Sequence, residues 1–188
     1  LKEHFWPPFR GTAMLVGNQD FLTFDGLTYS FAGECSYVLA HDFKDRDFTV
    51  IANYGKDDKD QLYRKSITVL SGEKKIEISS DYQVMKDDRT TDLPLVMDDM
   101  TVMRVRDSVI VNKNNGELTV DCQWKRNVCT VSLSGWHFGR TAGLLGTFNN
   151  EQNDDMMTSQ RTVLGADDIR GFADSWNVGE RCSTYSNR

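Results

Sequence analysis

Short β-rich segments, each ended by turn residues, constrain the fold of this sequence more than any other feature. Segments such as TAMLVG, CSYVLAHDF, FTVIANYG, KSITVLSG and MTVMRVRDSVIVN combine β-branched and aromatic residues with alternating apolar and polar positions. Gly, Asn and Asp interrupt the alternation about every eight to twelve residues, which is the turn spacing of antiparallel sandwiches and barrels. The sequence therefore predicts a mainly β fold, an antiparallel β-sandwich or barrel.

Local signals add hairpins and one helix to this picture. SGEKK at residues 71–75 and KNNGE at residues 113–117 predict tight hairpin turns, the second through its Asn-Gly pair. The segment GADDIRGFADSWNV has an acidic start and carries Ile169, Phe172 and Trp176 at helical spacing. It predicts a short C-terminal helix packed on a sheet. The charged segments KDDKDQ and KDDRTTD are expected to be exposed loops.

Composition and charge argue against nucleic-acid binding and against a membrane-spanning helix. The 188 residues suit one domain with a sizeable core, and their net charge of −6 comes without a basic stripe that could meet nucleic-acid phosphates. No apolar run approaches the roughly 20 residues of a membrane-spanning helix. We therefore expect a globular domain without a nucleic-acid partner and without a membrane span.

The four cysteines lack the spacing of a zinc site. Cys122 and Cys129 flank QWKRNV between two predicted strands, where hairpin pairing would bring them close enough for a disulfide. Cys35 and Cys182 remain as a long-range pair, which would attach the C-terminal helix to an early strand. Disulfides indicate an oxidising compartment, although the N-terminal LKEHFWPPFRG is not a signal peptide. We therefore expect a piece of a larger secreted protein.

A dense group of oxygen-bearing side chains follows a small apolar segment in GLLGTFNNEQNDD, residues 143–155. One interpretation is a polar connector, because Asn and Asp favour turns. The other is a calcium site, since calcium takes roughly 6–8 oxygen ligands, which a loop supplies well at alternating positions. The alternating residues are Thr147, Asn149, Glu151, Asn153 and Asp155. The spacing does not fit an EF-hand, so a calcium site would need a ligand from elsewhere in the chain.

The sequence offers little for catalysis. His4, His41 and His137 are isolated, and no nucleophile elbow, zinc-protease helix or phosphate-binding glycine loop is present. Ser134 lies close to His137 in the sequence, but we interpret the pair as a strand-end surface residue beside a half-buried ring. We therefore expect a domain that is not an enzyme.

Three motifs in order, FLTFDGLTYSFAGECSYVLAHD, GLLGTFNNEQNDDM and FADSWNVGERC, resemble a von Willebrand factor type D domain. The resemblance covers residues 12–182, which leaves residues 1–11 as a linker and 183–188 as a C-terminal tail. It implies a calcium ion held by the Thr-Phe-Asp-Gly turn and the acidic loop. The implied ligands are Asp25, Asn149, Asp154, Asp155, the backbone carbonyl of Glu151, and Thr147 where the family usually has Asn.

One departure from the family pattern bears on function. Multimer-forming members carry Cys-Gly-Leu-Cys-Gly, whereas TAGLLG here places Thr141 or Ala142, and Leu145, where the thiols would be. The chain therefore lacks the thiols for disulfide exchange. This cysteine-poor pattern is similar to domains of large lipid transfer proteins, most of all the apolipophorin type and then vitellogenin and clotting-protein relatives.

The resemblance implies a non-catalytic, calcium-stabilised extracellular module of a lipid-transport lipoprotein, with a structural or protein-interaction role. Its partners would be other domains of the same secreted protein, which circulates in haemolymph if it is apolipophorin-like. Lipid would be carried by the parent protein, and the isolated fragment would be monomeric. The alternatives are a module of a vitellogenin or clotting protein, or an adhesive or mucin-like extracellular module. The aromatic segment HFWPPF at residues 4–9 is either a linker whose rings pack on the domain or a lipid contact.

Overall fold

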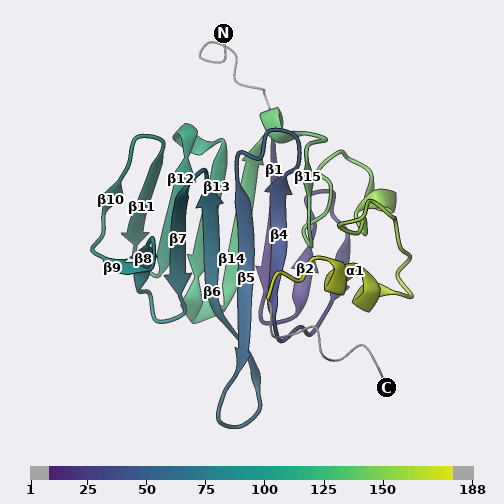
Figure 1. The fold of residues 1–188 in the computed structure, drawn as a ribbon, viewed down its shortest axis with the longest axis horizontal. Helices are drawn as coiled ribbons and strands as arrows, with labels where there is room; N and C mark the ends of the chain where they lie inside the picture. Colours follow the sequence, from purple (N-terminus) through teal and green to yellow (C-terminus); the bar gives the residue numbers. More distant parts are fainter. Residues whose placement is uncertain (1–8, 180–188) are drawn as a thin grey trace.

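Two antiparallel sheets lie face to face in the computed structural model, which describes residues 9–179 (Figure 1). The first sheet has eight strands in the order β10-β11-β12-β13-β14-β1-β2-β3, and the second has seven in the order β15-β4-β5-β6-β7-β8-β9. The predicted mainly β sandwich is thus confirmed, and the barrel alternative is not what the chain forms. The predicted linker and tail fall largely on residues outside the described range.

The strands of the first sheet are, in spatial order, β10 (Leu95–Val96), β11 (Met100–Val105), β12 (Ser108–Lys113), β13 (Leu118–Gln123), β14 (Val128–Ser134), β1 (Arg10–Val16), β2 (Asp20–Leu22) and β3 (Thr28–Ser30). Those of the second are β15 (Thr141–Ala142), β4 (Ser36–Asp42), β5 (Thr49–Lys56), β6 (Leu62–Ser71), β7 (Lys74–Ser79), β8 (Val84–Lys86) and β9 (Arg89–Thr91). Four 3-10 turns and one helix complete the described elements: η1 (Asn114–Gly116), η2 (Trp124–Arg126), η3 (Gly135–His137), η4 (Gln152–Asp154) and α1 (Ile169–Ser175).

Alternation along the strands places the core between the two sheets. In β13, Leu118, Val120 and Cys122 are buried while the residues between them are partly exposed. In β5, the same alternation buries Val50 and Ala52. Because successive side chains of a strand point to opposite faces, one face of each sheet is apolar and packs on the other sheet. The apolar alternation of the sequence therefore determines the sandwich.

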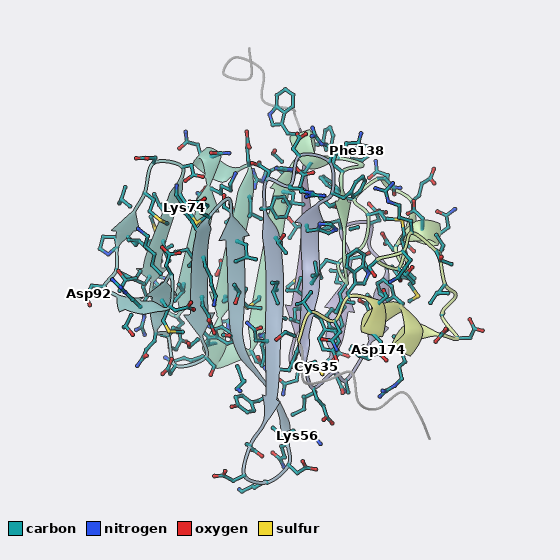
Figure 2. All side chains as sticks on the ribbon, viewed as in Figure 1. Cys35, Lys56, Lys74, Asp92, Phe138 and Asp174 are labelled. Carbon is teal, nitrogen blue, oxygen red and sulfur yellow. A yellow bond between two sulfur atoms is a disulfide. The ribbon has the colours of Figure 1, made fainter. Side chains whose placement is uncertain are left out.

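The hairpin turns form where the sequence predicts them. Gly72 and Glu73 connect β6 to β7, and η1 connects β12 to β13. KDDKDQ is an exposed loop at the tip of the β5–β6 hairpin, which projects at the lower end in Figure 2 beside Lys56. The loop prediction for KDDRTTD is wrong in part. Asp87 and Asp88, both at positive φ, make a two-residue hairpin turn that allows β9 to pair with β8.

The predicted C-terminal helix is confirmed as α1 (Figures 1 and 2). The carboxylate of Asp168 accepts a hydrogen bond from the Gly171 N–H at 3.0 Å, which caps the start of the helix. Phe172 is fully buried and its ring meets Tyr29 of β3 edge-on, with centroids 5.8 Å apart. Trp176 is buried and donates from Nε1 to the Met157 carbonyl at 3.0 Å. Apolar burial thus holds the helix on the sandwich.

No helix among residues 9–179 has the length and apolarity needed to cross a membrane.

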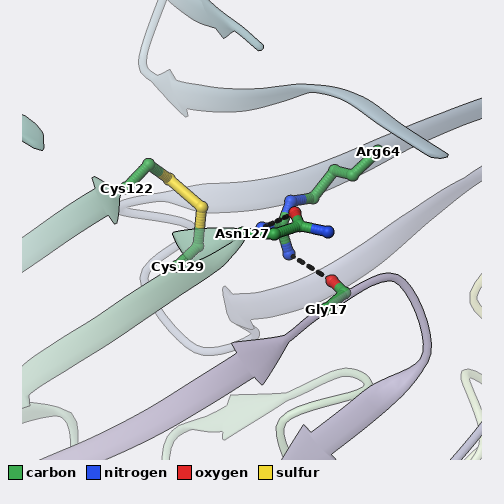
Figure 3. The surroundings of a disulfide bond; sticks show 5 residues. All are labelled: Gly17, Arg64, Cys122, Asn127 and Cys129. Carbon is green, nitrogen blue, oxygen red and sulfur yellow. Dashed lines mark hydrogen bonds between the residues drawn. A yellow bond between two sulfur atoms is a disulfide. The ribbon is translucent and has the colours of Figure 1, made fainter. Parts of the chain in front are cut away.

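The predicted Cys122–Cys129 disulfide is present and joins directly opposed residues of β13 and β14, whose Cα atoms are 4.1 Å apart (Figure 3). Beside it, Arg64 of β6 donates to the Gly17 carbonyl at 3.2 Å and to Asn127 Oδ1 at 2.8 Å, which ties the second sheet to two turns of the first. The other predicted bridge, between Cys35 and Cys182, involves a residue outside the described range and stays a prediction.

Replacing both Cys122 and Cys129 by Ala should lower the free energy of unfolding by about 2.5 kcal/mol, because the bridge closes a short loop in the unfolded chain. Urea denaturation measures the change. Thr119→Ala with Ser132→Ala, an opposed pair on the same two strands, is the matched control and should cost under about 1 kcal/mol. An unfolding midpoint that does not move in the cysteine variant would contradict this estimate.

Candidate metal centre

Three carboxylates from two distant segments converge at one end of the sandwich. Asp25 lies in the turn between β2 and β3, Asp154 is the last residue of η4, and Asp155 follows it. One carboxylate oxygen from each lies within 4.8 Å of the others. The segment that follows β15 passes beside β2 on the right of Figure 1, and it carries the two later aspartates. The structure thus brings together the acidic residues that the sequence assigned to one calcium site.

Aromatic side chains position the two acidic segments. Phe24 immediately precedes Asp25 and Phe148 immediately precedes Asn149, and their ring centroids are 5.4 Å apart. Phe148 also meets the rings of Phe9 and Phe138. A backbone hydrogen bond from the Phe24 N–H to the Leu145 carbonyl, at 3.0 Å, fixes the register between the segments. Apolar burial therefore holds the acids close together against their mutual repulsion.

Gly146 allows the closest approach within this loop. Its φ is +84°, and a Cβ at this position would lie 2.3 Å from Oδ1 of Asp155. A side chain at residue 146 would therefore displace the Asp155 carboxylate, in addition to the strain of a positive φ. The second glycine of GLLG is thus required by the geometry of the acidic cluster.

The Asp25 carboxylate is bound by backbone amides of the late loop. The N–H of Asn149 lies 3.0 and 3.1 Å from its two oxygens, and the N–H of Asn150 donates to Oδ1 at 2.8 Å. The Gln152 side chain donates from Nε2 to the Asp25 carbonyl at 2.9 Å. These bonds connect residues about 125 positions apart in the chain, and they orient Asp25 toward the loop.

The hydroxyl of Thr147 lies between all three carboxylates. Its Oγ1 is 2.7 Å from Asp154 Oδ1, 3.3 Å from Asp155 Oδ1 and 3.4 Å from Asp25 Oδ2. A hydroxyl has one hydrogen to donate, so it can satisfy one of these three carboxylates at a time. The Asn149 side chain donates from Nδ2 to the other oxygen of Asp154 at 2.7 Å. Three negative charges therefore converge on one neutral hydroxyl.

Asp155 is the buried member of the group, at 1% exposure. Its Oδ2 accepts from the Thr23 hydroxyl at 2.6 Å and its Oδ1 accepts from the Thr147 N–H at 3.0 Å. The pKa of the Asp155 carboxyl is raised to about 6: burial is the largest cause, the hydrogen bonds from Thr23 and Thr147 act to lower it, and the charge of Asp25 acts to raise it. Loss of water around the carboxylate is thus the largest cost of keeping Asp155 ionised.

No basic side chain compensates these acids. Within residues 9–179, none of the ion pairs includes Asp25, Asp154 or Asp155. The available donor set is all oxygen: three carboxylates, the Thr147 hydroxyl and the Asn149 amide oxygen, which now accepts from the Glu151 N–H at 2.9 Å. Hard cations such as calcium prefer such oxygen donors. The residues present therefore fit a calcium ion.

The alternating pattern of the loop does not describe its geometry. The 3-10 turn η4 interrupts the extended backbone that alternation requires, so Asp154 and Asp155 both reach the cluster although they are adjacent. Asn153 and Glu151 are exposed, and the Glu151 carboxylate stands outside the acidic group. The backbone carbonyl of Glu151, which the family resemblance implicates, stays an expectation.

Sequence reasoning missed two residues of the site and misjudged a second region. Thr23, which binds Asp155, and Gln152, which binds Asp25, were not singled out, although Thr23 begins the TFDG motif. The interpretation of Ser134 as a surface residue beside a half-buried His137 is wrong, because their exposures are 2% and 5%. Ser134 ends β14 and pairs with β1, whereas His137 ends η3 and packs against Phe48 of the β4–β5 connection.

Comparison with known proteins gives one family. The family model for the von Willebrand factor type D domain matches residues 13–162. Apolipophorins of Locusta migratoria are 34% identical over 177 residues, which cover 94% of this chain and 5% of that protein. Mucin-2 of Homo sapiens is 31% identical over 183 residues, which cover 93% of this chain and 3% of that protein. Von Willebrand factor of Bos taurus is 27% identical over 178 residues, which cover 92% of this chain and 19% of that protein. The chain therefore spans less than a fifth of the length of each of these relatives.

The raised pKa of Asp155 predicts how the metal-free protein responds to pH. An unfolded Asp titrates near 3.9, so the folded state binds the additional proton between about pH 4 and pH 6. The contribution of Asp155 to stability is therefore full below about pH 4 and falls as the pH rises through about 6. In EDTA, urea denaturation of wild type and Asp155→Asn should show the wild type losing up to about 2–3 kcal/mol relative to the variant across this range. A constant difference between the two proteins would show that Asp155 does not titrate in this way.

Proposed function

The chain belongs to the von Willebrand factor type D domain family, and from this premise we propose that it is a calcium-stabilised, non-catalytic module of a large secreted protein. The observation that carries the proposal is the convergence of Asp25, Asp154 and Asp155 on the single hydroxyl of Thr147. A divalent cation would balance most of this charge. The family resemblance and the local chemistry point to the same ion.

The proposed ligands come from two loops that belong to different sheets. Asp25 belongs to the β2–β3 turn of the first sheet, whereas the loop that follows β15 of the second sheet provides the others. They are Thr147, Asn149, Asp154, Asp155 and the backbone carbonyl of Glu151. When bound, the ion would neutralise the carboxylates and join the two loops. Its role here is structural, because a cation that binds the folded chain and not the unfolded chain stabilises the fold.

The relatives support a lipoprotein as the parent. Apolipophorins of several insects are 26–34% identical to the chain over nearly its whole length. The Cys122–Cys129 disulfide supports an oxidising compartment and hence secretion, into haemolymph for an apolipophorin-like parent. The chain equals about 5% of the locust protein, so the activity and partners of the parent are inferred from the relationship alone. The immediate partners would be neighbouring domains of that protein.

Within the parent, this module would supply structure or a protein contact while other regions carry lipid. Its large apolar side chains are mostly buried between the sheets. The exposed ones are scattered over β1, the β10–β11 edge and the loops: Phe9, Val16, Val96, Met103, Val105, Val163 and Val178. Phe9 packs its ring on Phe138, with centroids 5.5 Å apart, which favours a linker that packs on the domain over a lipid contact. Residues 4–8 of that segment are outside the described range.

A polymer-forming role lacks support from the TAGLLG segment. Thr141 or Ala142, and Leu145, stand where multimer-forming members have thiols, and all three residues are buried. Thr141 pairs with β4, and the Leu145 N–H donates to the Leu39 carbonyl at 2.8 Å. The side chains at these positions pack in the core, so an adhesive module of this kind would have to act without thiol exchange.

Calcium should raise the melting temperature of the chain. At a concentration 100-fold above the dissociation constant, linkage adds about 2.7 kcal/mol, or roughly 5–10 °C for a domain of this size. Asp155→Ala and Asp25→Asn should each remove most of this rise. Asp20→Asn, a carboxylate of the same β2–β3 hairpin that lies outside the cluster, is the matched control and should retain it. A melting curve that calcium leaves unchanged in the wild type would refute the site.

The division of labour with the parent is tested by vesicle sedimentation. The 188-residue chain should stay monomeric and in the supernatant with neutral and with anionic vesicles, whether calcium or EDTA is present, because its apolar surface is scattered. Co-sedimentation of the chain would contradict the proposed division. A Phe9→Ser variant then tells whether the ring that packs on Phe138 is the lipid contact.

A further inference from the structure

A second group of potential ligands lies away from the calcium loop. Asp47 lies in the β4–β5 connection just before β5, Glu117 between η1 and β13, and His137 at the end of η3. One ligand atom from each lies within 4.8 Å of the other two. Phe138, the residue after His137, is labelled at the upper end of the sandwich in Figure 2, opposite the β5–β6 hairpin tip beside Lys56. Both sheets contribute to the group.

The His137 side chain lacks a hydrogen-bond partner. The residue is 5% exposed, and within residues 9–179 neither Nδ1 nor Nε2 makes a hydrogen bond. Nδ1 is 4.0 Å from Oδ2 of Asp42, beyond hydrogen-bond distance. The ring is held edge-on against Phe48, with centroids 5.0 Å apart. Buried polar atoms almost always have a partner, so an imidazole without one points to a ligand that it would bind.

The charges around His137 leave room for a cation. Lys113 is buried and its ammonium binds Oδ1 of Asp47 at 3.1 Å. The carboxylates of Asp42, Asp47 and Glu117 act on the His137 ring, and only Asp47 is paired with the Lys113 ammonium, which leaves a formal excess of two negative charges. Arg140 also faces the ring, but its guanidinium is paired with Asp45.

A cleft borders this group on the side of Asp47. Asp47 and Lys113 line an open, highly charged cleft of about 660 Å³, together with residues of the β6–β7 turn and Asp99. The side chain of Asp47 is 37% exposed, so it can move. Glu117 is also partly exposed, and Asn114 binds its Oε2 at 3.1 Å. An ion that enters the cleft can therefore reach the Asp47 carboxylate, one member of the group.

We propose that His137, Asp47 and Glu117 bind a divalent transition-metal ion, with zinc the best match to the donor set. Calcium takes oxygen ligands, whereas an imidazole nitrogen with two carboxylates suits zinc and leaves a fourth position for water. Tetrahedral ligands at about 2.1 Å from zinc lie about 3.4 Å apart. The ligand atoms of the group already lie within 4.8 Å of one another, so inward rotation of the two carboxylates would complete the site while Phe48 packs on the ring. The ion would join the β4–β5 connection to the ends of β13 and β14.

Zinc titration by calorimetry tests the proposal, with saturating calcium present so that the acidic loop is not available to zinc. The wild-type chain should bind one zinc ion. His137→Gln should weaken the binding at least ten-fold, and so should Glu117→Gln, whose amide can still accept from Asn114. His41→Gln is the matched control, since His41 packs on Trp176 outside this group, and it should bind zinc as the wild type does.

A spectroscopic readout separates ligation from a loss of folding. Cobalt should produce visible absorption bands with the wild type and with His41→Gln but not with His137→Gln, while circular dichroism confirms that all three are folded. A wild type that does not bind zinc, or a His137→Gln variant that binds it as tightly as the wild type, overturns the proposal. If His137→Gln does not fold, the result for Glu117→Gln decides in the same way.

Discussion

The hydrogen bonds of the buried Asp155 carboxylate join parts of the molecule that the sheets alone do not connect. Thr23, at the end of β2, and Thr147, in the loop that follows β15, donate to its two oxygens, and Thr23 and Asp155 are 132 positions apart. One loop follows a strand of the first sheet and the other follows a strand of the second. Because Phe24 and Phe148, one from each loop, pack their rings on each other, the loops cannot separate without exposing apolar surface. The rest of the candidate site depends on this junction.

The same junction supports the proposed cation. Apolar packing and backbone amides bring Asp25, Asp154 and Asp155 together, and the charge of Asp25 adds to burial in raising the pKa of the Asp155 carboxyl. The donors that bind these carboxylates are a hydroxyl and a few N–H groups, and none of them carries a charge. The fold thus stores electrostatic repulsion where the two sheets meet, and binding of calcium would turn that repulsion into stability. A module whose two loops are joined by calcium would suit a large extracellular protein, because calcium is abundant outside the cell.

Much of the fold follows from the sequence by local rules. The alternation of β13 and β5, the Asn-Gly turn at η1 and the helical spacing of Phe172 and Trp176 are each decided by residues close together in the chain. The Cys122–Cys129 bridge was predictable for the same reason, because a hairpin places its ends opposite each other. The loop prediction for KDDRTTD was partly wrong because charged residues indicate exposure, not the absence of a strand. The strand β9 is itself largely exposed, so its polar residues resemble those of a loop.

The two candidate metal sites were harder to predict from the sequence, because their residues meet only in the folded structure. That Asp25 meets Asp154 followed from the resemblance to a family, since nothing local relates residues so far apart. The role of Thr23 and the 3-10 turn at residues 152–154 needed the structure. Asp47, Glu117 and His137 are ordinary loop residues in the sequence. Their grouping arises because the β4–β5 connection of one sheet covers the ends of β13 and β14 of the other.

Hydrogen exchange of individual amides tests the central claim most directly, namely that calcium joins the β2–β3 turn to the late loop. With calcium in place of EDTA, the amides of Asn149 and Asn150 in the loop and of Gly26 and Leu27 in the turn should exchange more slowly together. Amides at the tip of the β5–β6 hairpin, residues 57–61, should not change. Unchanged exchange in both segments, or protection of the loop without the turn, would contradict the account.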